Sequence, residues 1–215
     1  DSGLISKLKT KKLELFIVAA YGKILPKALL EIPKHGVLNV HPSLLPKFRG
    51  PSPVESAILA GEKETGVSIM LLDEKMDHGP IIENKKIKIE SEMKVSELEN
   101  LLAREGGKLL AEIIPDWLTG KIKPREQDHS HATYTKKIEK VDGLIDLTAN
   151  ALENYGKYRA FYDWPGIYFF VKHKGKNTRV SIKEALLKNG EFVIKRVIPE
   201  GKTEMKYTDF LRGLK

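Results

Sequence analysis

Two short apolar runs, Leu13-Glu-Leu-Phe-Ile-Val-Ala-Ala20 and Gly36-Val-Leu-Asn-Val-His41, decide the fold. The first run is nearly continuous in apolar residues, which is typical of a strand covered by helices on both faces of a parallel sheet. Between the two runs, residues Pro26 to Ile32 read as a short helix, and Pro26 suits its first turn. A strand, a helix and a second strand in this order predict an α/β fold.

The pattern continues downstream with further helices and strands. We expect a helix from Pro53 to Ala60 that ends at Gly61, and strands at Gly66 to Leu72 and Ile81 to Ile89. Leucines and isoleucines at helical spacing then run to Trp117. The sequence Ser96-Glu-Leu-Glu99 before them is a capping-box pattern, so we expect this helix to begin there and to pack on the sheet.

The sequence divides into a large first part and a small second part. Residues 121–140 are polar and lack a clear period, so we interpret them as a linker between a catalytic domain, residues 1–120, and a C-terminal domain, residues 141–215. The second part holds a short helix around Ala149 to Phe161 and three strand patterns. Two of these strands flank Asn189-Gly190, which is a strong hairpin signal. A small antiparallel β-module is therefore expected.

Composition excludes several kinds of chemistry. The chain has 215 residues, of which 41% are hydrophobic, and this is enough for a sizeable core. It contains no cysteine, which excludes disulfides, thiolate metal ligands and a cysteine nucleophile. No apolar run reaches the roughly 18 residues that a membrane span needs, and the N-terminus lacks the apolar segment of a secretory signal. We therefore expect a soluble, cytoplasmic protein.

Charge is distributed unevenly along the chain. Residues 151–215 hold 14 Lys and Arg against 7 Asp and Glu, whereas residues 1–150 hold 23 against 22. A basic module beside a nearly neutral one suggests that the basic module binds a polyanion and the nearly neutral one processes it. On charge alone, a solvated lysine-rich surface explains the same numbers.

Asn39 and His41 end the second predicted strand and leave the same face of it, and Asp77 follows 36 residues after His41. An amine that attacks a carbonyl carbon creates an oxyanion, which Asn39 and a protonated His41 are able to stabilise by hydrogen bonds. The carboxylate of Asp77 is able to accept the amine's proton through water and to orient the imidazole. Taken singly, the histidine fits a packing role equally well, and the aspartate fits a turn.

The segments Asn39-Val-His41-Pro-Ser-Leu-Leu-Pro46, Arg49-Gly50 and Asp73-Glu-Lys-Met-Asp77-His-Gly79-Pro80 resemble the formyltetrahydrofolate-dependent formyltransferases. The resemblance implies a partial Rossmann-like formyltransferase domain followed by a small antiparallel, OB-like C-terminal domain. It also implies 10-formyltetrahydrofolate as the formyl donor and a catalytic trio of Asn39, His41 and Asp77.

The same resemblance implies a folate site at the carboxyl ends of the strands, where ligands favour open α/β sheets. One half of it follows the first strand, and the other half follows His41. Each stretch also reads as an ordinary structural element, the first as a strand-to-helix loop and the second as a turn fixed by two prolines. The residues expected to bind folate are Tyr21, Gly22, Ile24, Leu25, Ser43, Leu44, Leu45 and Pro46.

The C-terminal part resembles the second domain of methionyl-tRNA formyltransferases, notably at Lys137-Ile-Glu-Lys-Val-Asp142-Gly143 and Trp164-Pro165-Gly166. This resemblance implies formylation of the α-amino group of methionyl-tRNA for translation initiation. A sugar-nucleotide N-formyltransferase and an inactive RNA-binding remnant are the alternatives. The expected tRNA contacts are Arg49, Lys172, Lys174, Lys176 and Arg179, although lysines also protect exposed strand edges.

Departures from the family pattern also matter. His78 stands where many relatives have threonine, and the family's further strand and helix units ahead of Leu13 are not in this sequence. We therefore expect a chain that lacks the first part of its catalytic domain. Asp128, His129 and His131 lie in a polar stretch without a fourth ligand, so we predict no metal site there. We expect a monomer.

Overall fold

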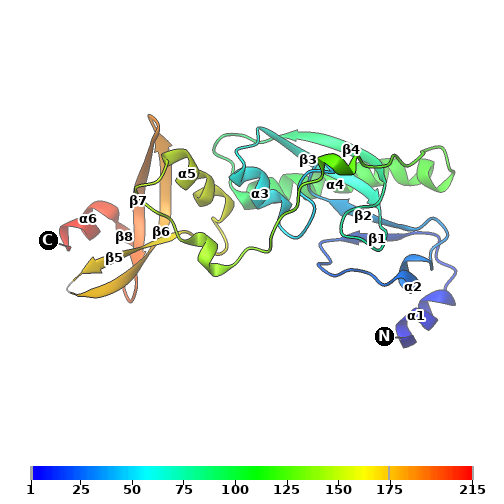
Figure 1. Ribbon diagram of the computed structural model, residues 1–215, viewed down its shortest axis with the longest axis horizontal. Coiled ribbons are helices and arrows are strands. Elements are labelled where there is room, and N and C mark those ends of the chain that lie inside the picture. Colours follow the sequence, from blue (N-terminus) through cyan, green and yellow to red (C-terminus); the bar gives the residue numbers. More distant parts are fainter. Residues whose placement is uncertain (1, 174, 215) are drawn as a thin grey trace. The chain divides into compact units, whose positions relative to one another are not determined.

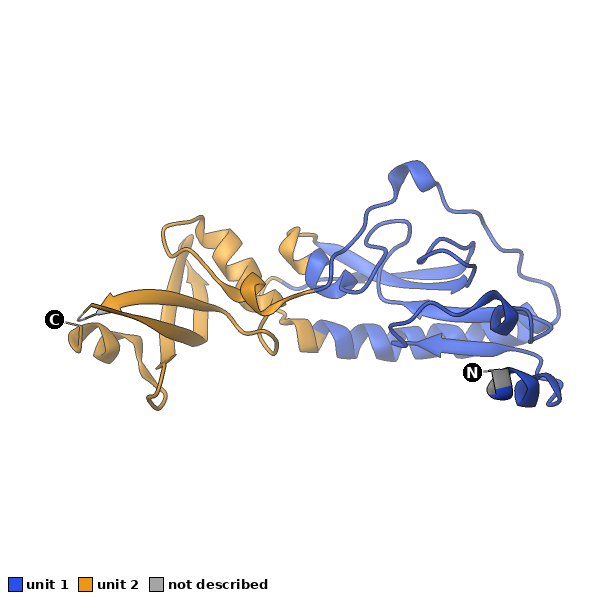
Figure 2. Cartoon of the chain, turned by 60° about the horizontal axis from the view of Figure 1, so that its bottom comes forward, with its two compact units in different colours: residues 1–57, 63–90, 98–137 blue, residues 58–62, 91–97, 138–215 orange. Residues whose placement is uncertain are grey.

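The computed structural model describes residues 2–173 and 175–214, which form two compact units (Figures 1 and 2). The first unit comprises residues 1–57, 63–90 and 98–137. The second comprises residues 58–62, 91–97 and 138–215, so short pieces of the earlier sequence belong to it. Among the residues that the structure describes, no helix is both long and apolar enough to cross a membrane.

A four-stranded sheet with the order β1-β2-β3-β4 forms the centre of the first unit (Figure 1). Its strands are β1 (Phe16–Ala19), β2 (Val37–His41), β3 (Glu64–Leu71) and β4 (Ile81–Lys88). The helices in or bordering this unit are α1 (Ser2–Lys9), α2 (Lys27–Leu30), α3 (Pro53–Leu59), α4 (Val95–Leu118) and the 3-10 helix η1 (His129–His131).

The strand directions correct one expectation. β1 and β2 are parallel, as predicted, but β3 runs antiparallel to β2 and β4 runs antiparallel to β3. The sheet is therefore mixed rather than parallel, because apolar runs show how deeply strands are buried but not their direction. Within the described residues β1 pairs with β2 alone, and Ile17 is 48% exposed. The two buried faces predicted for Leu13–Ala20 are thus not formed by these residues.

Helix α4 packs one face on the sheet, as predicted. Leu98, Leu102, Leu109 and Ile113 are buried. Gly106 lets the helix approach the sheet closely, since an added Cβ would lie 2.8 Å from Val40 and 3.0 Å from Val67. The helix begins at Val95, and the Glu97 carboxylate accepts a hydrogen bond from the Lys94 backbone N–H. The N-terminal cap of α4 therefore lies two residues earlier than the expected Ser96 pattern.

The polar stretch predicted as a linker, residues 121–140, lies mostly against the first unit. Arg125 forms a β-bridge with Ile81, and Tyr134 forms one with Arg49. The side chain of Gln127 is buried. Residues up to 137 thus belong to the first unit, and the second unit resumes at residue 138.

The second unit contains the expected antiparallel module, a four-stranded sheet with the order β5-β6-β7-β8 (Figure 1). Asn189 and Gly190 both have positive φ, at 51° and 80°, as a two-residue hairpin turn of type I′ requires. Asn154 is buried and donates a hydrogen bond to the Asp146 carbonyl oxygen. The elements are η2 (Lys140–Gly143), α5 (Ala151–Ala160), β5 (Tyr168–His173), β6 (Lys176–Lys188), β7 (Glu191–Pro199), β8 (Met205–Lys206) and α6 (Tyr207–Arg212).

Candidate functional site

A cavity of about 490 Å³ lies in the first unit, at the carboxyl ends of β1 and β2. This volume is in the range of small-molecule sites. Its walls come from the loop after β1, the end of β2, the first turn of α3 and the loop after β3. Asn39, His41 and Asp77 all line it, so the fold brings together the three residues that the sequence singled out.

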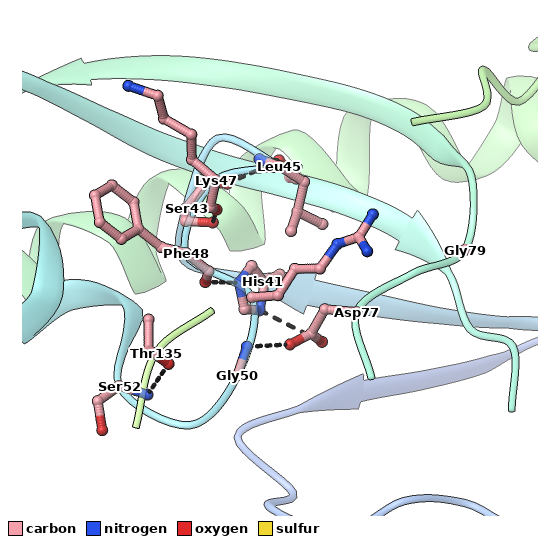
Figure 3. Close-up of polar contacts among 12 residues, drawn as sticks. His41, Ser43, Leu45, Lys47, Phe48, Gly50, Ser52, Asp77, Gly79 and Thr135 are labelled. Carbon is pink, nitrogen blue, oxygen red and sulfur yellow. Dashed lines mark hydrogen bonds and ion pairs between the residues drawn. The ribbon is translucent and has the colours of Figure 1, made fainter. Parts of the chain in front are cut away.

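The carboxylate of Asp77 lies between two groups of the neighbouring segments (Figure 3). Its Oδ2 accepts a hydrogen bond of 2.7 Å from the Gly50 backbone N–H, and its Oδ1 lies 3.6 Å from Nδ1 of His41. Asp77 has a φ of 47°, in the left-handed region that side chains rarely adopt. The surrounding contacts must therefore hold this residue in place.

Glycines permit the close approach of these loops. Gly50 has a φ of 109°, and a Cβ there would lie 2.8 Å from the Thr135 hydroxyl. A Cβ at Gly79 would lie 2.0 Å from the Leu71 carbonyl oxygen. Other residues at these two positions would push the Asp77 loop away from the end of β2.

The His41 ring is buried and fixed from one side. Its Nε2 lies 2.9 Å from the Phe48 carbonyl oxygen, which only accepts hydrogen bonds, so Nε2 carries a proton and donates. Nδ1 faces Asp77 at a distance longer than a hydrogen bond, so it is not committed to that carboxylate. A protonated ring would leave the Nδ1–H able to serve a reacting group at the cavity.

Asn39 is half-buried and lines the same cavity two residues before His41. Within residues 2–173 and 175–214 its side-chain amide has no hydrogen-bond partner. Its donors are therefore available to a bound group. This is the property that an oxyanion-stabilising residue needs.

The residues expected to bind folate fall into two groups. Tyr21, Gly22, Ile24 and Leu25 line the cavity beside the trio. Residues 43–46 are not among its lining residues. The Ser43 hydroxyl donates to the Lys47 carbonyl oxygen, and Leu45 packs against Met70 and Ile81 in the core. This segment instead supports the site, because Ser68 on β3 hydrogen-bonds to the backbone of both residues.

Sequence reasoning missed Glu55, which projects from the first turn of α3 and lines the cavity. Burial raises the pKa of its carboxyl group, and a hydrogen bond from its own backbone only partly offsets this. Carboxyl groups with perturbed pKa values in clefts are candidates for function. The local sequence around Glu55 did not predict that its side chain lines a cavity, because the direction of helix α3 depends on the whole fold.

The structure corrects the role expected for Arg49. Its side chain is 1% exposed, and its guanidinium donates to Gln127, Tyr134 and His129. A phosphate contact requires donors at the surface. The structure therefore contradicts the expected contact between Arg49 and tRNA.

The basic residues of the second unit differ in their surroundings. Lys172 and Lys176 are exposed on the paired strands β5 and β6. Arg179 is half-buried, and its guanidinium lies 3.8 Å from the centre of the Tyr168 ring. Lys174, also expected to contact tRNA, lies outside the described residues.

Asp128, His129 and His131 each have partners within the protein. Asp128 accepts hydrogen bonds from Ser130 and lies 3.1 Å from Nδ1 of His131. His129 stacks on His78, with ring centres 4.1 Å apart. These contacts account for the cluster without a metal ion.

Two protein families match the chain. Residues 1–114 match the family described as "Formyl transferase", and residues 137–192 match "Formyl transferase, C-terminal domain". The methionyl-tRNA formyltransferase of Chloroflexus aurantiacus is 46% identical over 170 residues, which are 79% of this chain and 55% of that protein. That of Thermodesulfovibrio yellowstonii is 38% identical over 237 aligned residues, covering 100% of this chain and 75% of that protein. The chain thus matches about half the length of the first relative.

Solved structures share the fold. The methionyl-tRNA formyltransferase from Clostridium thermocellum superposes with a TM-score of 0.69 at 21% identity, covering 91% of this chain and 81% of that one. An N-formyltransferase from Helicobacter canadensis, solved with folinic acid and dTDP-3-aminofucose, gives a TM-score of 0.64 at 21% identity. That match covers 78% of this chain and 60% of the other.

Proposed function

Because the chain belongs to the formyl transferase family, we propose that it transfers a formyl group from 10-formyltetrahydrofolate to the α-amino group of methionyl-tRNA. The observation that carries this proposal is the cavity in which Asn39, His41 and Asp77 meet. The identity to methionyl-tRNA formyltransferases, at 38% over the full chain for one relative, favours this acceptor.

The cavity suits a folate because a backbone loop and an apolar wall flank the trio. Tyr21, Gly22, Ile24 and Leu25 supply that loop. In this proposal the pteridine ring lies against residues 21–25, and the formyl group points towards β2. No metal ion takes part in this mechanism.

The reaction follows from the available donors and acceptors. The free amine of the acceptor attacks the formyl carbon, and its C–N bond forms as the carbonyl oxygen becomes an oxyanion. The amide of Asn39 and the Nδ1–H of a protonated His41 donate hydrogen bonds to that oxygen. Asp77 accepts the amine's proton through water. The bond from the formyl carbon to N10 then breaks, and N10 takes up a proton to give tetrahydrofolate.

The second unit is proposed to bind the tRNA. Its surplus of seven positive charges over residues 151–215 complements a polyanion, and Lys172 and Lys176 are exposed. Phosphate contacts by such lysines hold nucleic acid without reading its sequence. We further propose that the protein acts in the cytoplasm as a monomer, in translation initiation.

A comparison of acceptors tests this function. Formyl transfer from 10-formyltetrahydrofolate would be measured to methionyl-tRNA and to an amino-sugar nucleotide, using the longest natural protein that contains this sequence. Preference for methionyl-tRNA supports the proposal. Preference for the sugar would assign the chain to the sugar-nucleotide N-formyltransferases, and tRNA binding without transfer to either would indicate an inactive RNA-binding remnant.

A further inference from the structure

Arg49 is a buried cation surrounded by neutral partners. Its Nε and Nη2 donate to Oε1 of Gln127 at 3.2 and 2.7 Å, and its Nη1 donates to the Tyr134 hydroxyl at 3.2 Å. Its Nη2 also lies 2.8 Å from Nδ1 of His129. Removing a guanidinium from water is costly, and no ion pair with a described carboxylate offsets that cost. Such a group calls for an explanation beyond packing.

Arg49 fixes the orientation of the Gln127 amide. A guanidinium only donates hydrogen bonds, so the atom of Gln127 that faces it must be the oxygen. The amide nitrogen then points the other way, where it donates to the carbonyl oxygens of Asp77 at 3.0 Å and Gly79 at 2.7 Å. A reversed amide would place N–H groups against the guanidinium and an oxygen against two carbonyls. Gln127 is 5% exposed, so water does not relieve that clash.

The pair connects the two loops that hold the Asp77 carboxylate. Gly50, which follows Arg49, donates its N–H to Oδ2 of Asp77, while Gln127 holds the backbone of Asp77 itself. Asp77 has a strained positive φ, so its position depends on such contacts. We propose that Arg49 and Gln127 are positioning residues, which hold the Asp77 carboxylate beside Nδ1 of His41. Neither side chain needs to touch a substrate.

The effect on rate rests on the proposed function, whereas the geometric claim does not. Gln127→Glu is the sharpest variant, because it keeps an acceptor for Arg49 but replaces the donor with an oxygen facing two carbonyls. We expect kcat to fall about 10- to 100-fold, because a small misplacement of a reacting group lowers the rate by about this factor. KM for 10-formyltetrahydrofolate should change less than about threefold. Gln127→Asn, which retains both groups on a shorter side chain, should give a smaller loss.

A second readout does not depend on activity. A crystal structure of Gln127→Glu should show the Asp77 carboxylate displaced from Nδ1 of His41 and from the Gly50 N–H, because the hydrogen bond that holds the Asp77 backbone is lost. Trp117→Phe serves as the control, since it removes one hydrogen bond, from Trp117 to the His35 carbonyl oxygen, outside the cavity. It should leave both the position of the Asp77 carboxylate and kcat unchanged.

The outcomes separate the two proposals. An unchanged position of the Asp77 carboxylate in Gln127→Glu and Gln127→Asn, or an equal displacement in Trp117→Phe, would overturn the positioning role. Absence of formyl transfer by the unsubstituted protein would overturn the proposed function, and the crystal structures of the variants would still decide the positioning role. If Gln127→Glu does not fold, Gln127→Asn decides by the same two readouts.

Discussion

Replacing Asp77 by asparagine tests the trio most directly. The amide has the shape of the carboxylate, and its oxygen is able to accept the hydrogen bond that Gly50 donates to Oδ2. The loop should therefore keep its conformation. What the variant loses is the negative charge 3.6 Å from Nδ1 of His41 and the ability to accept a proton from the amine.

The size of the effect follows from that distance. Two unit charges 3.6 Å apart interact by about 4 to 5 kcal/mol at an effective dielectric of about 20. This is an upper limit on the lost stabilisation of a protonated His41, and about 1.4 kcal/mol corresponds to a tenfold change in rate. We therefore expect Asp77→Asn to lower kcat about 100- to 1,000-fold, with little change in the Kd of a folate analogue.

Single-turnover formylation of methionyl-tRNA would measure the rate, and calorimetry with 5-formyltetrahydrofolate would measure binding. Asp116→Asn is the matched control, because Asp116 is a surface residue paired with Lys121 outside the cavity. If Asp77→Asn retained more than about a tenth of the normal rate, the carboxylate would be neither the proton acceptor nor the partner of a charged His41.

Three further changes test other parts of the molecule. His41→Ala should reduce kcat about 100- to 1,000-fold while folate binding measured by calorimetry stays within a few-fold; a variant with nearly full turnover would exclude His41 from the chemistry. Replacing Lys172 and Lys176 together by alanine should raise KM for tRNA and reduce the slope of log K against log salt by about two, and an unchanged slope would assign these lysines to solubility. Burial raises the pKa of Glu55, so its ionisation opposes folding as pH rises through that raised value. Glu55→Gln should thus raise Tm by about 1 to 3 °C at pH 7 and leave it unchanged well below the ordinary carboxyl pKa of 4.5, and an equal rise at both pH values would contradict this reasoning.

The sequence alone predicted most of the local structure and singled out the three residues that meet at the cavity. Apolar periodicity predicted β2, β3, β4 and α4 to within a few residues, and Asn189-Gly190 predicted the turn between β6 and β7. Asn39 and His41 were predictable as neighbours because side chains two apart on a strand share a face. Asp77 was found through the family resemblance, and the fold places it at the same cavity.

Only the tertiary structure decided the contacts between distant segments. Local patterns do not encode strand direction, so the antiparallel course of β3 was not predictable from its apolar run. The sequence predicted Arg49 to be a surface cation, because arginine is rarely buried. In the structure, the Arg49 guanidinium instead donates hydrogen bonds to Gln127, 78 residues away, and to Tyr134 and His129. Such partners meet only when the chain packs, since their positions depend on loops whose conformation is set by long-range hydrogen bonds rather than by local propensity.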